Sequence, residues 1–415
     1  MQYNTYDEML NNSIDNIAYK TFDKVHYNIF EDIPEHLQVR NLDLRKIALS
    51  CTTDTLDLAD DKYDLKNKYV LLCMIDENSF NTEIQHIKHI KNIDKLNFTF
   101  CESFNSLFLN FVNLETIEGL ENIDISNADT LSFMFQNCKS LKSINLSNFN
   151  TSNAEYMNGM FNNCISLQTL DLSNFDTSNV ISMDYMFEGC ESLVSLDLTN
   201  WDMSNVVNMY GMFRNCSSLL SLDLNNFNTS NAKTIAFIFQ NCTSLQQIDL
   251  SNWDTSNITN TSYMFENCKS LTSLNLNNWN TQNLRLIDNM FQNCTSLITL
   301  DLSNWNTSNI TDMDCVFKNC ELLQQINISN WNTSKVISMD ELFYNCKSLK
   351  SLNLSNWDVS KVILMDGMFE NCDSLVEIDL TNCTNAYKLI NQAKESNLNN
   401  LTTIQSKIDN EYIEN

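Results

Sequence analysis

The amino-acid sequence predicts an α/β solenoid, in which short repeated coils stack on one another to form a continuous core. Two observations predict this fold class: a cysteine recurs every 26 residues, and a phenylalanine stands three residues before each one. The cysteines are Cys138, Cys164, Cys190, Cys216, Cys242, Cys268, Cys294, Cys320, Cys346 and Cys372. The third observation is the small size of the unit, which cannot bury its apolar side chains unless copies stack against it.

Each repeat is predicted to begin with a strand and a turn. Residues 193–198 read Leu-Val-Ser-Leu-Asp-Leu, an L-x-x-L-x-L pattern whose alternating leucines point to one side of a strand. Trp201 follows, at the position where a standard leucine-rich repeat places Asn or Cys. Because the chain has only 5 Gly and 1 Pro, the turns must be made by Asn, Asp, Ser and Thr.

The second half of each repeat is predicted to be a short helix. Met209, Met212, Phe213 and Cys216 have a 3-1-3 spacing, which is typical of one face of a two-turn helix. The preceding residue is of an N-cap type in six units, as Ser182, Asn208, Thr234, Asn260, Asp312 and Ser338. Acidic residues two positions later favour a helix N-terminus, as Asp184, Asp288, Asp314, Asp340 and Asp366. We therefore expect a leucine-rich-repeat-type array of about ten to twelve strand–turn–short-helix coils, with a parallel sheet on one face.

The regularity of this pattern divides the chain into three parts. Residues 1–92 are expected to be an N-terminal cap of uncertain fold, in which residues 6–22 have the pattern of an amphipathic helix. Residues 93–383 form the predicted solenoid, and residues 384–415 are expected to be a helical C-terminal cap with a polar tail.

The repeats also resemble those of a known family. The pattern M-F-x-N-C-x-S-L-x-x-L-D-L-S-N-W-D-T-S-N-V, clearest in residues 186–206 and 264–284, is similar to the 26-residue repeat of BspA-like leucine-rich-repeat surface proteins. The similarity runs from Phe108 to Cys383. It implies a solenoid used for adhesion and protein–protein contact at microbial surfaces, with host or cell-surface proteins as partners.

The location of the protein is left open by the sequence. The resemblance implies the cell surface or secretion, but no basic segment followed by an apolar stretch marks a signal peptide, so the cytoplasm is the alternative. No run approaches the ~20 apolar residues of a transmembrane helix. The net charge of −27 repels phosphate backbones and disfavours nucleic acid as a partner.

The best candidate binding surface is the outward position of the L-x-L strand. Every full unit has Asp or Asn there, and the site residues that we select are Asp171, Asp197, Asp223, Asp249 and Asp301. Such a stripe can bind Ca²⁺ or a basic partner, whereas the simpler interpretation is a solvated polar face. The helix side is a poorer candidate because its outward residues follow no evident pattern, as Arg214, Gln240, Glu266, Gln292 and Lys318.

The asparagines after the strands have a structural interpretation. They are Asn148, Asn174, Asn200, Asn226, Asn252, Asn278, Asn304, Asn330, Asn356 and Asn382, and we expect their amides to tie each turn to the next coil.

The cysteines and histidines each have two interpretations. Stacked thiols can bind a soft metal, but we favour buried core residues because the column shares the apolar face and lacks CxxC pairs. Cys315 lies off the column and is expected to be an exposed thiol. His86 and His89 could share a metal on one helix, although a solvated helix face is favoured.

No catalytic motif appears in the sequence, and near-identical units dilute the unique constellation that an active site needs. The sequence thus predicts a non-enzymatic protein-binding solenoid without a cofactor. The alternative is an intracellular structural scaffold, with any activity confined to residues 1–92.

Overall fold

The computed structural model describes residues 33–73, 81–396, 398 and 400–406, and the chain divides into two compact units between Gln38 and Val39. The described part of the first unit holds the 3-10 helix η3 (Glu35–Leu37), after which the short strand β1 (Gln38–Val39) crosses the boundary. The helix predicted over residues 6–22 lies outside the described residues.

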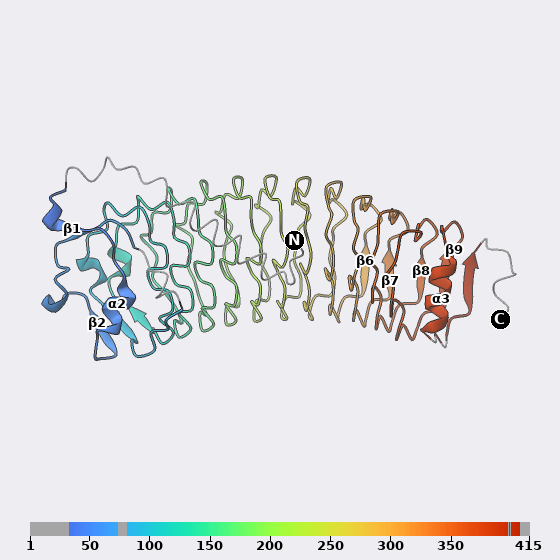
Figure 1. Ribbon diagram of the computed structural model, residues 1–415, viewed down its shortest axis with the longest axis horizontal. Helices are drawn as coiled ribbons and strands as arrows, with labels where there is room; N and C mark the ends of the chain where they lie inside the picture. The colour runs from blue at the N-terminus through green and yellow to red at the C-terminus, as the bar shows by residue number, and fades with distance from the viewer. Residues whose placement is uncertain (1–32, 74–80, 397, 399, 407–415) are drawn as a thin grey trace. The chain divides into compact units, whose positions relative to one another are not determined.

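The second unit begins with short elements that lead into the stack. They are α2 (Leu44–Leu49), β2 (Thr55–Asp57), η4 (Asp61–Tyr63), β3 (Tyr69–Val70), β4 (His89–Lys91), η6 (Ile93–Lys95), β5 (Thr116–Ile117) and η7 (Leu120–Asn122). Asp43 caps α2 by accepting the Arg45 and Lys46 N–H groups at 3.0 and 3.2 Å. Strands β2, β4 and β5 pair in parallel (Figure 1). Parallel stacking therefore extends upstream of residue 93, into the segment for which the sequence predicted only a cap.

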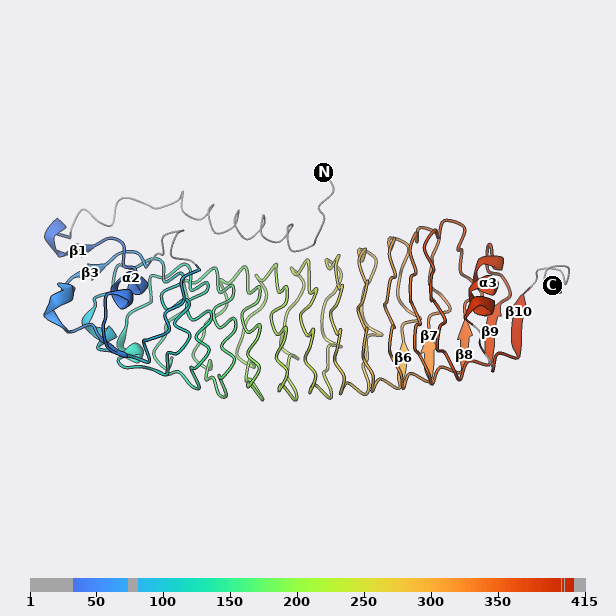
Figure 2. The same cartoon turned by 60° about the horizontal axis from the view of Figure 1, so that its bottom comes forward.

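The predicted strands are present on one side of the later repeats, whereas residues 193–198, for which a strand was predicted, are not part of a strand. Strands β6 (Thr299–Asp301), β7 (Gln325–Asn327), β8 (Ser351–Asn353) and β9 (Glu377–Leu380) come from consecutive coils. The pairs β6–β7 and β8–β9 are parallel with a register of 26 residues, so that Thr299 lies opposite Gln325 (Figure 2). The leucine-rich-repeat-type solenoid predicted from the sequence is thus confirmed on this side, which we call the strand side.

The other side of the repeats, which we call the turn side, is also a parallel ladder. Single parallel bridges join equivalent residues of successive coils, as Ser103, Thr130, Tyr156, Ser182, Asn208, Thr234, Asn260, Leu286, Asp312, Ser338 and Leu364. Alternate N–H groups then continue the ladder: those of Gly211 and Phe213 donate to carbonyls of the following coil at 2.9 and 3.0 Å. The intervening N–H groups close tight local turns, so that the backbone is hydrogen-bonded without a helix.

The predicted short helices are therefore wrong. Gly211 and Asn215 have φ angles of 57° and 60°, in the left-handed region, whereas an α-helix needs about −63° at every residue. The six residues predicted to be N-caps form the parallel bridges instead. Met209, Met212, Phe213 and Cys216 are nevertheless buried as expected, since the turns also direct these side chains inward.

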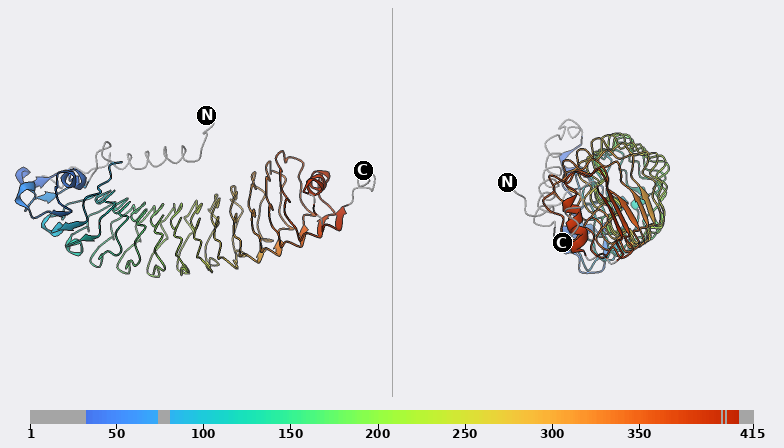
Figure 3. Two further views of the ribbon diagram at one scale, coloured as in Figure 1. Left: turned by 90° about the horizontal axis from the view of Figure 1, so that it is seen from below. Right: turned by 90° about the vertical axis from the view of Figure 1, so that its right-hand side faces the viewer.

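The core is a set of columns that run through the stack. The Phe135 to Phe369 column is buried throughout, and its neighbouring rings stack with centroids 5.5–6.2 Å apart. Leucine, tryptophan and methionine columns surround it, and Figure 3 includes a view along the stack in which successive coils overlie one another. Stacking identical coils thus buries side chains that a single coil would expose.

The C-terminal end of the stack is covered by α3 (Tyr387–Glu395) and β10 (Thr403–Ser406). Leu389, Ile390 and Ala393 of α3 are buried against the core, and β10 adds one parallel strand to β9. Lys388 fixes the helix by donating from Nζ to the carbonyls of the preceding coil, at 2.7 Å for Val362.

Candidate partner-binding surfaces

The strand-face carboxylates, Asp171, Asp197, Asp223, Asp249 and Asp301, are all exposed on the strand side. Each accepts the N–H of the residue two positions later through Oδ1, at distances of 2.9–3.1 Å. Only Asp301 ends a strand, β6, but all five side chains close an Asx turn and so have a structural role as well as a charge. Within the described part of the chain, their Oδ2 atoms accept no hydrogen bond and face no cation.

Local hydrogen bonds favour the ionised form of Asp171, Asp197 and Asp249. Ser173 lowers the pKa of Asp171, Thr199 lowers that of Asp197, and the Ser251 N–H lowers that of Asp249. The charge of Asp171 opposes part of the effect at Asp197, because neighbouring coils bring like charges close together. The row therefore presents negative charge from coil to coil along the strand side.

Exposed aliphatic side chains accompany the carboxylates. Val194 and Leu220 stand three residues before Asp197 and Asp223, and they are 46% and 45% exposed. The Leu220 N–H donates to the Val194 carbonyl at 3.1 Å, which places the two residues side by side on adjacent coils. This part of the strand side therefore combines apolar surface with negative charge.

The geometry does not favour the Ca²⁺ hypothesis. Across residues 33–73, 81–396 and the few described after them, no group of three or more His, Cys, Asp or Glu side chains is arranged to hold a metal ion. Calcium needs six to eight oxygen ligands, whereas the strand-face carboxylates lie on separate coils and use Oδ1 for their own turns.

The asparagines after the strands include members that tie coils together as predicted. Such bonds are present for Asn148, Asn174, Asn226, Asn330 and Asn356, each of which donates from Nδ2 to a carbonyl of the previous coil. Their structural interpretation is confirmed at these five positions.

A second asparagine column, on the turn side, was missed by the sequence interpretation. The residue before each column cysteine is Asn or, once, Gly189, and most members have φ near 60°. Amide groups of consecutive coils bond to one another at 2.7–2.9 Å from Asn215 to Asn345. The exchange of Asn for Gly was the available signal, because these residues tolerate the left-handed conformation best.

The outward residues of the turn side do follow a pattern. Gln136 donates to Asn162, Asn162 donates to Glu188, and Arg214 pairs with Glu188 at 3.4 Å. Gln240 likewise donates to Glu266. Residues that looked unrelated in the sequence therefore form two short runs in which donors contact acceptors on the next coil, although Gln136 Oε1, Arg214 Nε and Gln240 Oε1 are buried without a hydrogen-bond partner among the described residues.

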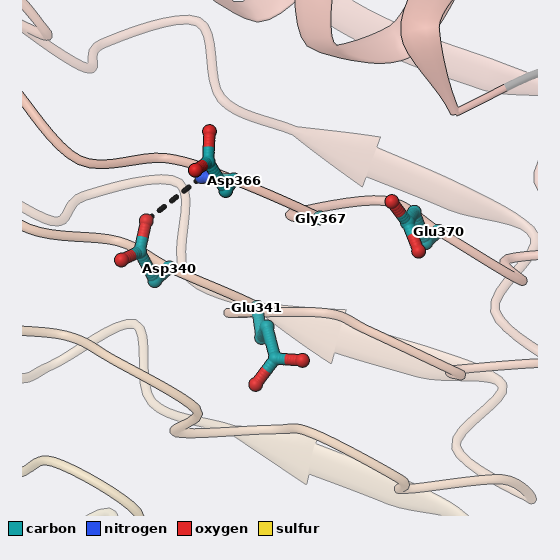
Figure 4. A pocket seen from close by; sticks show the side chains of 5 residues that line it. All are labelled: Asp340, Glu341, Asp366, Gly367 and Glu370. Carbon is teal, nitrogen blue, oxygen red and sulfur yellow. Dashed lines mark hydrogen bonds between the residues drawn. The ribbon is translucent and has the colours of Figure 1, made fainter.

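The turn side also has an acidic pocket, lined by Asp340, Glu341, Asp366, Gly367 and Glu370, with a volume of about 310 Å³. Figure 4 shows its four carboxylates on two neighbouring coils, with an Asp340 oxygen accepting the Asp366 N–H at 2.8 Å. Burial, and then the charges of Asp314, Asp366 and Glu341, raise the pKa of Asp340. Lys318 pairs with Glu341 at 2.5 Å.

The column cysteines are free, buried thiols, as expected for core residues. Each also donates from Sγ to the carbonyl of a phenylalanine in the preceding coil, as Cys294 does to Phe265 at 3.1 Å. Cys315, which we expected to be exposed, is only half-exposed and donates to Glu341 at 3.5 Å. Burial raises the pKa of Cys315 to about 12, so that it carries little thiolate.

The two histidines do not share a helix. His89 begins β4 and contacts Thr116 Oγ1 through Nδ1 at 2.9 Å, whereas His86 contacts the Ala48 carbonyl through Nε2 at 3.0 Å. The helix that both interpretations of these histidines assumed is therefore not formed.

Comparisons with known proteins identify a family. The family model described as "Mycoplasma protein of unknown function, DUF285" matches residues 102–220, 190–300 and 286–404. A search of curated proteins found no match. No helix among the described residues has both the length and the apolar character needed to cross a membrane.

Several solved structures are similar at low identity. A leucine-rich-repeat protein from Eubacterium ventriosum is 14% identical with a TM-score of 0.36, over 81% of this chain and 87% of that one. One from Bacteroides ovatus is 14% identical with a TM-score of 0.33, over 91% and 97%. A leucine rich cell surface protein from Faecalibacterium prausnitzii is 13% identical with a TM-score of 0.33, over 89% and 90%. Because these scores are below 0.5, the fold assignment rests on the coil geometry described above.

Proposed function

The chain belongs to the DUF285 family, whose description assigns no function, and we propose that it is a non-enzymatic protein-binding solenoid of a microbial surface. Its strand side binds a basic protein partner, a host or cell-surface protein, through the strand-face carboxylates. The observation that carries the proposal is the row of exposed carboxylates whose Oδ2 atoms are unused, beside exposed Val194 and Leu220. Repeating coils present such a row over a length that matches an extended polypeptide.

Charge and apolar surface have separate roles in this proposal. Exposed carboxylates add little affinity each because water and salt screen them, but a row of them speeds the approach of a basic partner. Val194 and Leu220 supply the apolar contact that binding desolvates.

The test replaces Asp171, Asp197, Asp223 and Asp249 by Asn, which other coils already have at this position. A matched control replaces Asp176, Asp202, Asp254 and Asp358 by Asn, removing the same charge from a different row of Asx turns. Proteins from a cell-surface extract are captured on each variant, and the dissociation constants of the captured proteins are then measured. We expect the first variant to bind at least tenfold more weakly and the control to bind like the wild type. Equal weakening in both variants, or none in either, contradicts the proposal.

A second candidate, an intracellular scaffold, has one observation in its favour. The column thiols act as hydrogen-bond donors, a role that only the reduced form can fill, and reducing compartments maintain that form. Labelling intact cells with a membrane-impermeant amine reagent separates the two candidates, because surface display predicts labelled lysines and an intracellular scaffold predicts none.

A further inference from the structure

Three branched aliphatic side chains are exposed together on the turn side, close to the C-terminal end of the stack. Ile363 is 79% exposed, and Leu364 and Ile337 are 49% and 46% exposed. The Ile363 and Leu364 N–H groups both donate to the Ile337 carbonyl, at 2.8 and 3.3 Å. Ile337 and Ile363 are thus equivalent residues on adjacent coils, and the three side chains form one apolar patch.

The acidic pocket begins three residues further along the same two coils. Asp340 follows Ile337 and Asp366 follows Ile363, while Ser338 and Leu364 form the parallel bridge that fixes the register. Asp366 and Glu370 are exposed, and no ion pair joins them to a cation in the described part of the chain. The patch therefore has apolar side chains at one end and uncompensated carboxylates at the other.

We infer that this patch, Ile337, Ile363 and Leu364 with the adjoining acidic pocket, docks a peptide segment of another protein in which basic and apolar side chains alternate. An exposed aliphatic cluster is typical of an interaction site, and the four carboxylates decide the charge of what covers it. Another copy of this chain is disfavoured, because each copy has a net charge of −27. The inference goes beyond the proposed function, because these residues lie on a different segment of the coil from the strand-face carboxylates.

A peptide probe and two control peptides test the contributions of the apolar patch and the acidic pocket separately. The probe is a fluorescein-labelled nonapeptide of alternating lysine and leucine, whose binding to the full chain is followed by fluorescence anisotropy. Two control peptides replace all leucines by serine or all lysines by glutamate. We expect at least tenfold weaker binding of both controls, and a dissociation constant of the probe that rises with salt because exposed charges contribute.

Matched variants locate the binding site. Ile363→Ser with Leu364→Ser removes the apolar patch, and Asp366→Asn with Glu370→Gln removes two charges from the pocket. Val194→Ser with Leu220→Ser removes comparable aliphatic surface from the strand side. We expect the first two variants to bind the probe at least tenfold and threefold more weakly than the wild type, and the third to lose less affinity than either of them. Circular dichroism of every variant confirms that the fold is retained.

Four outcomes overturn the inference. The wild type does not bind the probe, or all three variants bind it equally, or sedimentation shows a wild-type dimer that Ile363→Ser with Leu364→Ser dissociates. The third outcome makes the patch a contact between copies of this chain. A loss of binding confined to Val194→Ser with Leu220→Ser assigns the peptide to the strand side, which supports the proposed function and contradicts this inference.

Discussion

The two sides of the coils differ in how far they were predicted: the strand side forms the predicted strands in β6 to β9, whereas the turn side forms a parallel ladder where the sequence predicted helices. On the strand side, alternation of leucine with polar residues has one structural interpretation, and the pairing of β6 with β7 agrees with it. On the turn side, the 3-1-3 spacing of apolar residues fits a helix and also fits turns with two left-handed residues. Spacing therefore determines which side chains reach the core, but it does not determine the backbone between them.

Aspartates on the two sides also differ, in exposure and in the direction of their pKa shifts. Asp197 on the strand side is exposed, and hydrogen bonds from Thr199 lower its pKa. Asp184 on the turn side is buried among neutral donors, Ser182, Asn158, Asn208 and the Tyr210 N–H. Burial raises the pKa of Asp184 to about 7, despite these donors. A carboxylate of the first kind is ionised and exposed to solvent, whereas one of the second kind couples the stability of the fold to pH.

The largest expected effect comes from the column that lies between the two sides. Phe239 stacks on Phe213 and Phe265 with centroids 5.8 and 5.6 Å apart, and it is fully buried. Phe239→Ala should lower the free energy of unfolding by about 3–5 kcal/mol. Hydrogen exchange should show lost protection in the neighbouring coils first, on both sides, because each coil contacts only its neighbours. Uniform loss along the whole array would contradict this local coupling.

The next prediction concerns the pH dependence of the free energy of unfolding, which should distinguish buried Asp184 from exposed Asp197. Since the folded protein holds the Asp184 proton up to about pH 7 and the unfolded chain releases it near pH 4, the stability contributed by this proton falls as the pH rises from 4 to 7. Between pH 5.5 and 7 the loss is about 2 kcal/mol, at ~1.4 kcal/mol per unit. Urea unfolding at pH 5.5 and 7.5 should therefore show a weaker pH dependence for Asp184→Asn than for the wild type.

Asp197→Asn is the control, because a lowered pKa leaves that group ionised in both states throughout this window. Equal pH dependence in the wild type and Asp184→Asn would show that Asp184 is not the responsible group.

The third prediction compares two substitutions of Asn293, whose order of stability shows whether the turn-side backbone forms turns or a helix. Asn293 has a φ of 62°, donates to Asn267 at 2.8 Å and accepts from Asn319 at 2.7 Å. Asn293→Ala should lower the free energy of unfolding by about 2 kcal/mol, since alanine is strained there and both amide hydrogen bonds are lost. Asn293→Gly keeps the conformation and should cost about 1 kcal/mol. A helix predicts the opposite order, with alanine the most stable of the three, and thermal unfolding of the three proteins distinguishes the two.

Burial and repetition were predictable from the sequence, whereas the turn-side backbone and its hydrogen bonds were not. The core positions of Met209, Phe213 and Cys216 followed from spacing, because a solenoid repeats each contact at every coil. The hydrogen bonds through Asn293 could not be predicted from the spacing of residues, because they depend on the left-handed φ that this residue adopts in the folded coil. The row of strand-face carboxylates was visible in the sequence, but the exposed patch at Ile363 was not, since buried and exposed aliphatic residues alternate there with no distinguishing composition.

The smallest effect concerns the thiols between the two ladders. If Cys294 were only a small apolar core residue, Cys294→Ala would be nearly neutral and Cys294→Ser clearly worse, because serine would bury a hydroxyl without a partner. The structure instead gives Sγ a role as donor to the Phe265 carbonyl at 3.1 Å, beside the Cys268 N–H that bonds the same oxygen at 3.0 Å. Alanine then leaves one acceptor site unfilled and should cost about 1 kcal/mol, whereas serine keeps a donor and should cost no more than alanine. Urea unfolding of both variants measures their free energies of unfolding. A serine variant that is much less stable than the alanine variant would show that the cysteines act only as small apolar core residues.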